Sequence, residues 1–264
     1  MNGLWESVFD DATLLLETMP ERALAADVEH RQQWYAETIG PMVVRDDQLV
    51  AVDRAAENLG VGPIPVQVIN TTGAGGLVAL AGRTVDNLTV TAVESALRDL
   101  DDLPGNAARV VAAARELPAE VEVFVEFPAH RGWEAAVEVV EAEGLFGMIR
   151  IDGPSDNRTG VLDQLQTLVE ADLPFKIAGT AQPFPYGILQ LLNALLAVID
   201  DADPQIVSDL LDTNTDTDTN ALAASVAAWS DLESGKVRRR LRGIGCTDIA
   251  SVVTELERHS LLHR

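Results

Sequence analysis

Four charged side chains lie in or beside apolar segments, and their types suit acid–base and carbonyl chemistry. Lys176 lies within residues 174–180, a short apolar run, and is one of only two lysines in the chain. Glu94, Glu126 and Arg150 lie in or at the ends of three earlier apolar segments. An unpaired charge is unstable in apolar surroundings, so a buried lysine needs either a carboxylate partner or a chemical use.

These residue types allow two interpretations. In the catalytic one, Lys176 is an amine nucleophile with a lowered pKa, and Glu126 and Glu94 move protons. Arg150 then binds an anionic group of the substrate. In the structural one, the two acids and two bases neutralise one another in a buried network. Burial and a nearby arginine lower the pKa of a lysine whereas carboxylates raise it, so the sequence leaves the direction of the shift open.

An alternation of apolar strands and amphipathic helices must position these residues. Five strands are predicted, at residues 64–69, 88–93, 121–127, 146–151 and 174–180. Helical patterns of about 10–15 residues separate most of them, which predicts right-handed βαβ units and a parallel sheet. In a parallel barrel, active sites gather at the carboxyl ends of the strands, where neighbouring strands bring their side chains together.

The predicted fold class is α/β, a TIM-barrel-like (β/α) barrel. Residues 1–60 are predicted to be an N-terminal helical extension, because their apolar residues recur at helical spacing. Residues 61–264 are predicted to be the barrel-like domain, in one structural unit with the extension. The periodicity weakens after residue 200, so the last strands are predicted to be irregular. An open doubly wound sheet is the alternative fold.

Two further motifs predict substrate contacts. Between a strand and a helix, residues 70–76 place Gly73 and Gly75 where backbone N–H groups can face a phosphate. A plain strand-to-helix turn also fits, because the lysine of a P-loop is missing. His130 follows the third predicted strand, at the face where barrel enzymes bind their substrates.

Other polar clusters carry weaker signals. Residues 212–220 resemble the start of a calcium loop but lack its turn glycine, and no His, Cys and acid spacing indicates a zinc site. The sequence therefore predicts neither a metal nor another cofactor. Residues 238–240 together with Arg242 form a basic cluster, which either binds an anion or pairs with local acids.

The composition excludes several classes of function. A net charge of −23, from 42 acids against 19 bases, repels nucleic acid and anionic membranes. Abundant acids with only two lysines resemble the composition of proteins from salt-loving archaea, although an ordinary acidic protein from a high-GC organism is the alternative. A single cysteine allows no internal disulfide, and the first residues lack the basic region of a signal peptide. These features predict a cytoplasmic protein and are compatible with a homo-oligomer.

Three short segments in the second half of the chain carry a family resemblance. They are Met148-Ile-Arg-Ile-Asp-Gly153, Pro174-Phe-Lys-Ile-Ala-Gly-Thr-Ala-Gln-Pro183 and Gly243-Ile-Gly-Cys-Thr247. The chain resembles a family of uncharacterised bacterial β/α-barrel-like proteins, whose members carry a Phe-Lys-Ala-Thr-Ala-Gly-Leu-His-His-Pro segment and a late Gly-Ser-Cys motif. The resemblance implies a barrel-like fold, with this chain as a divergent member, and carries over Arg150, Lys176 and Cys246. It implies no activity.

The chain departs from that family at two places. The His-His pair falls on Gln182 and Pro183, so a metal or acid–base role of that pair is absent here, and the family's serine falls on Ile244 or Gly245. The few residues around Lys176 also resemble strands of Schiff-base lyases and aldolases. This second likeness is an analogy, and a shared fold does not by itself transfer function.

The leading functional hypothesis is a lyase or aldolase-type enzyme that acts on a small anionic carbonyl compound through Lys176. The alternative is a non-catalytic barrel that binds a small anion or a protein partner, so the sequence leaves open whether the chain is an enzyme. A pocket beside an accessible Lys176 would favour catalysis. A Lys176 that is ion-paired in a closed interior would exclude this enzyme interpretation.

Overall fold

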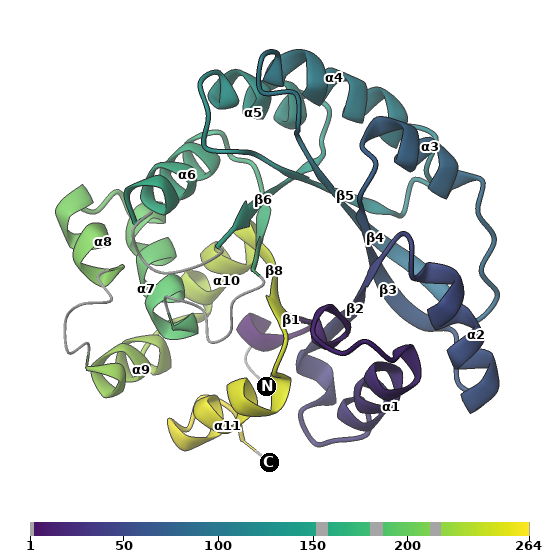
Figure 1. The fold of residues 1–264 in the computed structure, drawn as a ribbon. Helices are drawn as coiled ribbons and strands as arrows, with labels where there is room; N and C mark the ends of the chain where they lie inside the picture. Colours follow the sequence, from purple (N-terminus) through teal and green to yellow (C-terminus); the bar gives the residue numbers. More distant parts are fainter. Residues whose placement is uncertain (1–2, 152–157, 180–186, 212–217, 264) are drawn as a thin grey trace.

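Eight parallel strands close into a barrel, and they follow one another round the ring in chain order (Figure 1). The computed structural model describes residues 3–151, 158–179, 187–211 and 218–263. The strands are β1 (Phe9–Asp11), β2 (Ile39–Arg45), β3 (Ile64–Asn70), β4 (Leu88–Ala96), β5 (Glu122–Glu126), β6 (Phe146–Arg150), β7 (Phe175–Ala178) and β8 (Leu241–Cys246). This architecture confirms the predicted TIM-barrel-like α/β fold.

Helices form the outer layer around the strands (Figure 1). They are α1 (Pro20–His30), α2 (Leu49–Leu59), α3 (Ala74–Ala81), α4 (Leu103–Ala114), α5 (Trp133–Ala142), α6 (Arg158–Glu170), α7 (Ile188–Ile199), α8 (Pro204–Leu210), α9 (Thr219–Ala227), α10 (Asp231–Arg240) and α11 (Ile249–Arg258). Of these helices, α8, α9 and α10 lie between α7 and β8, in a part of the chain where the periodicity of the sequence is weak.

The prediction that residues 1–60 form only helices outside the barrel is wrong. Helices α1 and α2 lie where helices were expected, but β1 and β2 are the first two strands of the barrel. Strand β1 is only three residues long and contains Asp10 and Asp11, so it shows no apolar alternation. Gly40 and Pro41 near the start of β2 form a Gly-Pro pair, which in a sequence usually indicates a turn or loop. The five predicted strands are therefore β3 to β7, and Lys176 lies on the seventh strand.

The closing strand β8 is not among the five strands that the sequence predicts. It pairs in parallel with β7 on one side and with β1 on the other, although its sequence is Leu-Arg-Gly-Ile-Gly-Cys. Two glycines weaken the strand propensity, so only the pairing with its neighbours makes this segment extended. The pairing of β7 with β8 contains a register shift, as do the pairings of β1 with β2 and of β3 with β4.

The two faces of the sheet are packed differently. Outward side chains such as Val68, Val125 and Ile149 belong to one large apolar core between strands and helices. The apolar cluster inside the barrel is much smaller and consists of Ala92, Phe124, Met148 and Ala178, with Phe146 packed against it. Barrel interiors are usually filled by layers of large aliphatic residues. This interior instead leaves room for charged side chains.

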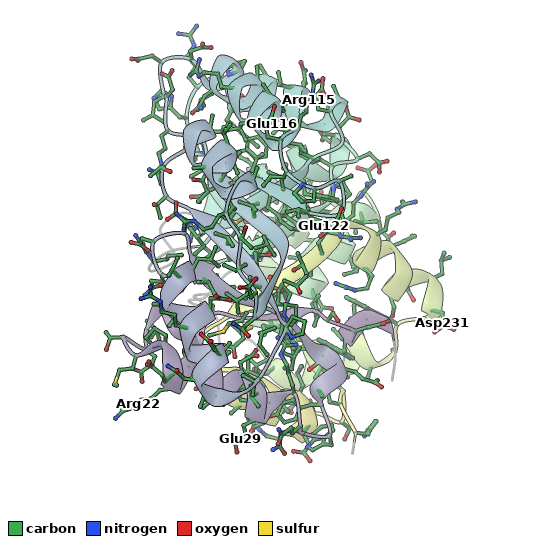
Figure 2. The ribbon with its side chains drawn as sticks, turned by 90° about the vertical axis from the view of Figure 1, so that its right-hand side faces the viewer. Arg22, Glu29, Arg115, Glu116, Glu122 and Asp231 are labelled. Atoms are coloured by element: carbon green, nitrogen blue, oxygen red, sulfur yellow. The ribbon has the colours of Figure 1, made fainter. Side chains whose placement is uncertain are left out.

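The outer surface carries the excess of acids. Figure 2 shows Glu29, Glu116 and Asp231 projecting outward from different parts of the molecule, with Arg22 and Arg115 among them. With 42 acids and 19 bases, like charges dominate this surface. Among the described helices, none combines the length and the apolar character that crossing a membrane would require.

We expect the thermal stability of the protein to rise with KCl concentration. Repulsion among the surface acids opposes the compact state, and salt shortens its range from about 10 Å at 0.1 M to about 3 Å at 1 M. Circular dichroism melts at KCl concentrations below and above about 1 M should show that Tm rises more steeply below that concentration than above it. A rise confined to sulfate salts, which strengthen apolar burial, would contradict the charge explanation.

Candidate functional site

Lys176 lies in the closed interior of the barrel between two carboxylates. Its Nζ donates to Asp10 Oδ2 at 2.6 Å and lies 2.9 Å from Glu94 Oε1. The three residues come from β7, β1 and β4, so this cluster ties together strands far apart in the sequence. Lys176 has no exposed surface, and Asp10 and Glu94 are almost as deeply buried.

The network continues from Glu94 toward the carboxyl ends of the strands. Arg150 Nη2 lies 3.7 Å from Glu94 Oε2, and Arg150 Nε lies 2.9 Å from Glu126 Oε2. Gln67 Nε2 donates to Glu94 Oε1 at 2.5 Å. The side chains of Glu126 and Arg150 keep 20% and 22% of their surface exposed, whereas Glu94 keeps 3%. The accessible end of the network is therefore the Glu126–Arg150 pair.

The strand registers explain this order. Lys176 pairs with Met148, and Ala178 pairs with Arg150, so Arg150 stands one interior layer nearer the carboxyl ends than Lys176. Glu126 is the last residue of β5 and pairs with Met148, two residues before Arg150, and its carboxylate reaches Arg150 at 2.9 Å. The structure thus brings together all four charged residues that the sequence marked, as neighbouring strands of a barrel require.

Two members of the network were missed in the sequence. Asp10 lies in a segment that was interpreted as helical, so its inward position was not apparent. Gln67 was visible as a polar residue in the middle of an apolar strand, and this signal could have found it. Glycines make room for Asp10, because a Cβ at Gly40 would overlap Asp10 Oδ1 and a Cβ at Gly243 would lie 2.9 Å from Asp10 Oδ2.

The electrostatics of the network keep Lys176 charged. Burial by itself lowers the pKa of Lys176, but the attraction of Asp10 and Glu94 and their hydrogen bonds outweigh it and raise that pKa above its ordinary value. Burial raises the pKa of Asp10, and the lysine opposes this shift. An amine nucleophile must be neutral and reachable. Lys176 is buried and ion-paired, which favours the structural interpretation for this residue.

The buried Cys246, which the family resemblance carried over, is no reactive thiol either. Its Sγ donates to the carbonyl oxygen of Ile244 at 3.6 Å. Burial, together with the negative charges of Asp10 and Asp11, raises the pKa of the thiol far above its ordinary value. Reactive cysteines have a lowered pKa, because the thiolate is the nucleophile.

His130 lies in a different environment from the network. It is exposed and lines a cavity of about 290 Å³ together with Trp133, Asp163 and Gln164. None of the five charged residues of the network lines this cavity. The structure does not bring His130 together with the predicted catalytic residues.

The loop before α3 is closed by side chains. Asn70 Nδ2 donates to the carbonyl oxygen of Gly73 at 2.8 Å, and Asn70 Oδ1 accepts from the amide of Thr72. Asp46 accepts from the amide of Thr71. The loop donors that precede Gly73 thus have protein partners, which favours the plain turn. The role of Gly73 and Gly75 in phosphate binding stays a prediction.

Some predicted motifs lie outside the described residues. This holds for Gln182 and Pro183 and for residues 212–217 of the calcium-loop-like segment. Asp218, at the end of that segment, accepts from the amides of Asn220 and Ala221 and thus caps α9. Within the described ranges, no group of three or more His, Cys, Asp or Glu side chains is arranged to hold a metal ion.

Comparisons with known proteins do not identify the chain. No model of a protein family matches it, and no curated protein matches it significantly. The resemblance to the bacterial barrel-like family, the cytoplasmic location and the compatibility with a homo-oligomer therefore stay predictions.

The two lysines offer a direct test of the closed interior. In the folded protein, formaldehyde with a borohydride reductant should methylate Lys236 and leave Lys176 unmodified. Lys236 pairs with Asp200 but keeps 35% of its side chain exposed, whereas Lys176 is inaccessible. Peptide mapping by mass spectrometry measures both sites. In denaturant both lysines should react, and equal labelling of the two in the folded protein would contradict the closed interior.

Replacement of the lysine should destabilise the fold strongly. We expect Lys176→Met to lower the free energy of unfolding at pH 7 by about 3–5 kcal/mol, because Asp10 and Glu94 would lose their shared cation. Urea unfolding measures this, and further changes of Asp10→Asn and Glu94→Gln should restore part of the loss. A Lys176→Met variant as stable as the wild type would refute this account.

The same pair predicts an alkaline limit of stability. The folded-state pKa of Lys176 is raised above its ordinary value of 10.5, so its contribution is complete below pH 10.5 and is lost as the pH rises through the folded-state pKa. Urea unfolding above pH 10.5 should therefore show a loss of stability in the wild type that is smaller in Lys176→Met.

Proposed function

We propose that this chain is an enzyme that acts on a small carbonyl compound at the carboxyl ends of its barrel strands. The observation that carries this proposal is that Glu126 and Arg150 are the accessible members of an otherwise buried charged network. Barrel enzymes have their active sites at this end of the strands. A partly exposed carboxylate beside a guanidinium supplies a proton acceptor and a stabiliser of negative charge in one place.

Glu126 acts as the base in this proposal. Its carboxylate takes a proton from the carbon next to the carbonyl group. The electron pair of that C–H bond forms a C=C bond to the carbonyl carbon, and the π electrons of the C=O bond move onto the oxygen, which becomes negatively charged. The guanidinium of Arg150 stabilises this oxyanion. Proton transfer of this kind begins many lyase and aldolase-type reactions, so the proposal keeps that reaction class.

Lys176 has a positioning role here. Its fixed positive charge holds Glu94 in place, and Glu94 in turn lies against Arg150. Lys176 does not act through a Schiff base in this proposal, because its amine is buried and ion-paired.

The charges of the network favour a neutral substrate over an anionic one. Among the described residues, three carboxylates (Asp10, Glu94 and Glu126) share two cations (Lys176 and Arg150). An anionic group would have to displace Glu126 from Arg150, which leaves one more carboxylate without its partner. A neutral carbonyl compound binds at a smaller cost in free energy, because its oxygen needs only a hydrogen-bond donor before the reaction starts.

A non-catalytic barrel is the second candidate. It is supported by the mutual satisfaction of the network, in which every acid lies against at least one base. Buried ion pairs of this kind also occur as purely structural features. A test of function must therefore detect proton transfer itself.

We expect the protein to exchange protons next to a carbonyl group with solvent, and Glu126→Gln to lose this exchange. A panel of neutral and anionic carbonyl metabolites in D₂O, followed by ¹H NMR, detects deuterium incorporation without knowledge of the complete reaction. Removal of a general base should lower the exchange rate by about 10²–10⁴-fold.

Glu122→Gln is the matched control. Glu122 is the first residue of β5 and pairs with Arg242, so it stands at the other end of the same strand in the same kind of ion pair. It should keep the exchange activity. Equal loss in both variants would point to general destabilisation. A folded wild-type protein that exchanges no compound of the panel would favour the non-catalytic barrel.

A further inference from the structure

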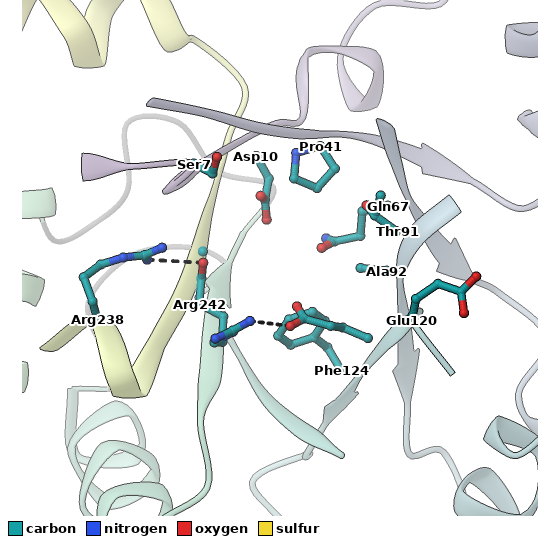
Figure 3. A pocket seen from close by; sticks show the side chains of 12 residues that line it. Ser7, Asp10, Pro41, Gln67, Thr91, Ala92, Glu120, Phe124, Arg238 and Arg242 are labelled. Carbon is teal, nitrogen blue, oxygen red and sulfur yellow. Dashed lines mark hydrogen bonds and ion pairs between the residues drawn. The ribbon is translucent and has the colours of Figure 1, made fainter. Parts of the chain in front are cut away.

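A cavity of about 360 Å³ lies at the amino-terminal end of the barrel, away from the Glu126–Arg150 pair (Figure 3). Its lining includes Pro41 near the start of β2, Glu122 at the start of β5 and Arg242 near the start of β8, together with Ser7, which precedes β1. Pockets for small molecules typically measure about 300–1,000 Å³. The volume therefore suits a small metabolite.

One side of this cavity carries a fixed positive charge. Arg238 Nη1 donates to the carbonyl oxygen of Leu241 at 2.7 Å, and Nη2 donates to that of Glu6 at 3.0 Å. No carboxylate in the described part of the chain lies within ion-pair distance of Arg238. Arg242, by contrast, pairs with Glu122 and covers the ring of Phe146. Carbonyl oxygens orient Arg238 without neutralising it, so its charge is available to an anion.

Another wall supplies an unused acceptor. Asp10 Oδ2 accepts from Lys176, whereas Oδ1 accepts a hydrogen bond from no residue that the structure describes. The side chain is 5% exposed and lines the cavity. Figure 3 shows the carboxylate of Asp10 pointing toward the middle of the cavity. A carboxylate oxygen that faces the cavity in this way can accept a hydrogen bond from a ligand.

We propose that this cavity binds a small zwitterionic amino acid, with its carboxylate on Arg238 and its ammonium group on Asp10 Oδ1. Arg238 and Asp10 both line the cavity but make no ion pair with each other, so they hold opposite charges on either side of space that a ligand can occupy. Phe124, Ala92 and Pro41 offer apolar surface to a short side chain.

The two charges also discriminate against simpler ligands. A carboxylate without an amine would bring a second negative charge near Asp10 and would offer no donor to Asp10 Oδ1. An amine without a carboxylate would leave Arg238 unpaired. Binding should therefore require both groups in one molecule, and this requirement separates the proposal from unspecific attraction of anions by arginine.

Isothermal titration calorimetry of the full chain tests the proposal with glycine, alanine and γ-aminobutyrate, against acetate and methylamine. At least one amino acid should bind at least about tenfold more tightly than either simple ion, which corresponds to 1.4 kcal/mol. Ligands at up to roughly 10 mM would reveal any site with a Kd near 1 mM. No amino-acid binding in this range, or equal binding of acetate, would overturn the proposal.

Variants locate the site. Arg238→Gln should abolish binding, whereas Arg239→Gln should not, because the neighbouring Arg239 is exposed and does not line the cavity. If Arg238→Gln does not fold, Ala92→Met decides, since the longer side chain would fill the cavity. Unchanged binding in Ala92→Met would refute this site. Glu126→Gln should bind the amino acid normally, so the outcome is independent of the proposed catalytic role.

Discussion

The ion pairs of Lys176 with Asp10 and Glu94 are the constraint around which this barrel is built. A protonated amine in the centre of a closed sheet is tolerable only if carboxylates surround it, and both of these carboxylates come from strands far from β7 in the sequence. Asp10 comes from the first strand and Lys176 from the seventh, so their contact across the interior requires that the barrel is closed. Gly40 and Gly243 are part of the same constraint, because side chains at these positions would displace the Asp10 carboxylate.

This constraint divides the interior into two ends. Toward the carboxyl ends of the strands, the network continues through Glu94 to the accessible pair of Arg150 and Glu126. Toward the amino ends, Asp10 forms part of the wall of a cavity that also contains Arg238 and Arg242. Asp10 and Glu94 share Lys176, so the loss of either of these two carboxylates alters the field at the other. In the low dielectric of a protein interior, such effects are stronger than they would be in water.

The few apolar residues inside the barrel make this arrangement compatible with stability. Phe124 and Met148 fill the middle, and the ring of Phe124 lies 5.6 Å from Lys176 Nζ. The larger apolar core lies outside the sheet, where valine, leucine and isoleucine side chains of the strands meet the helices. Most hydrophobic stabilisation therefore comes from the helix layer. The interior is left for the charged network, in contrast to the layers of large aliphatic residues that usually fill a barrel.

Local sequence determined the middle of this protein well. Strands β3 to β7 combine apolar runs with intervening helical periodicity, so the barrel class and the inward positions of Glu94, Glu126, Arg150 and Lys176 followed from the pattern. Only the tertiary structure decided that β1, β2 and β8 are strands, because three residues with two aspartates, a Gly-Pro start and a glycine-rich run have little strand preference of their own. The chemistry of Lys176 was decided in the same way. Its pKa depends on Asp10, 166 positions away, and no local pattern reports a partner that only the closed barrel brings within 2.6 Å.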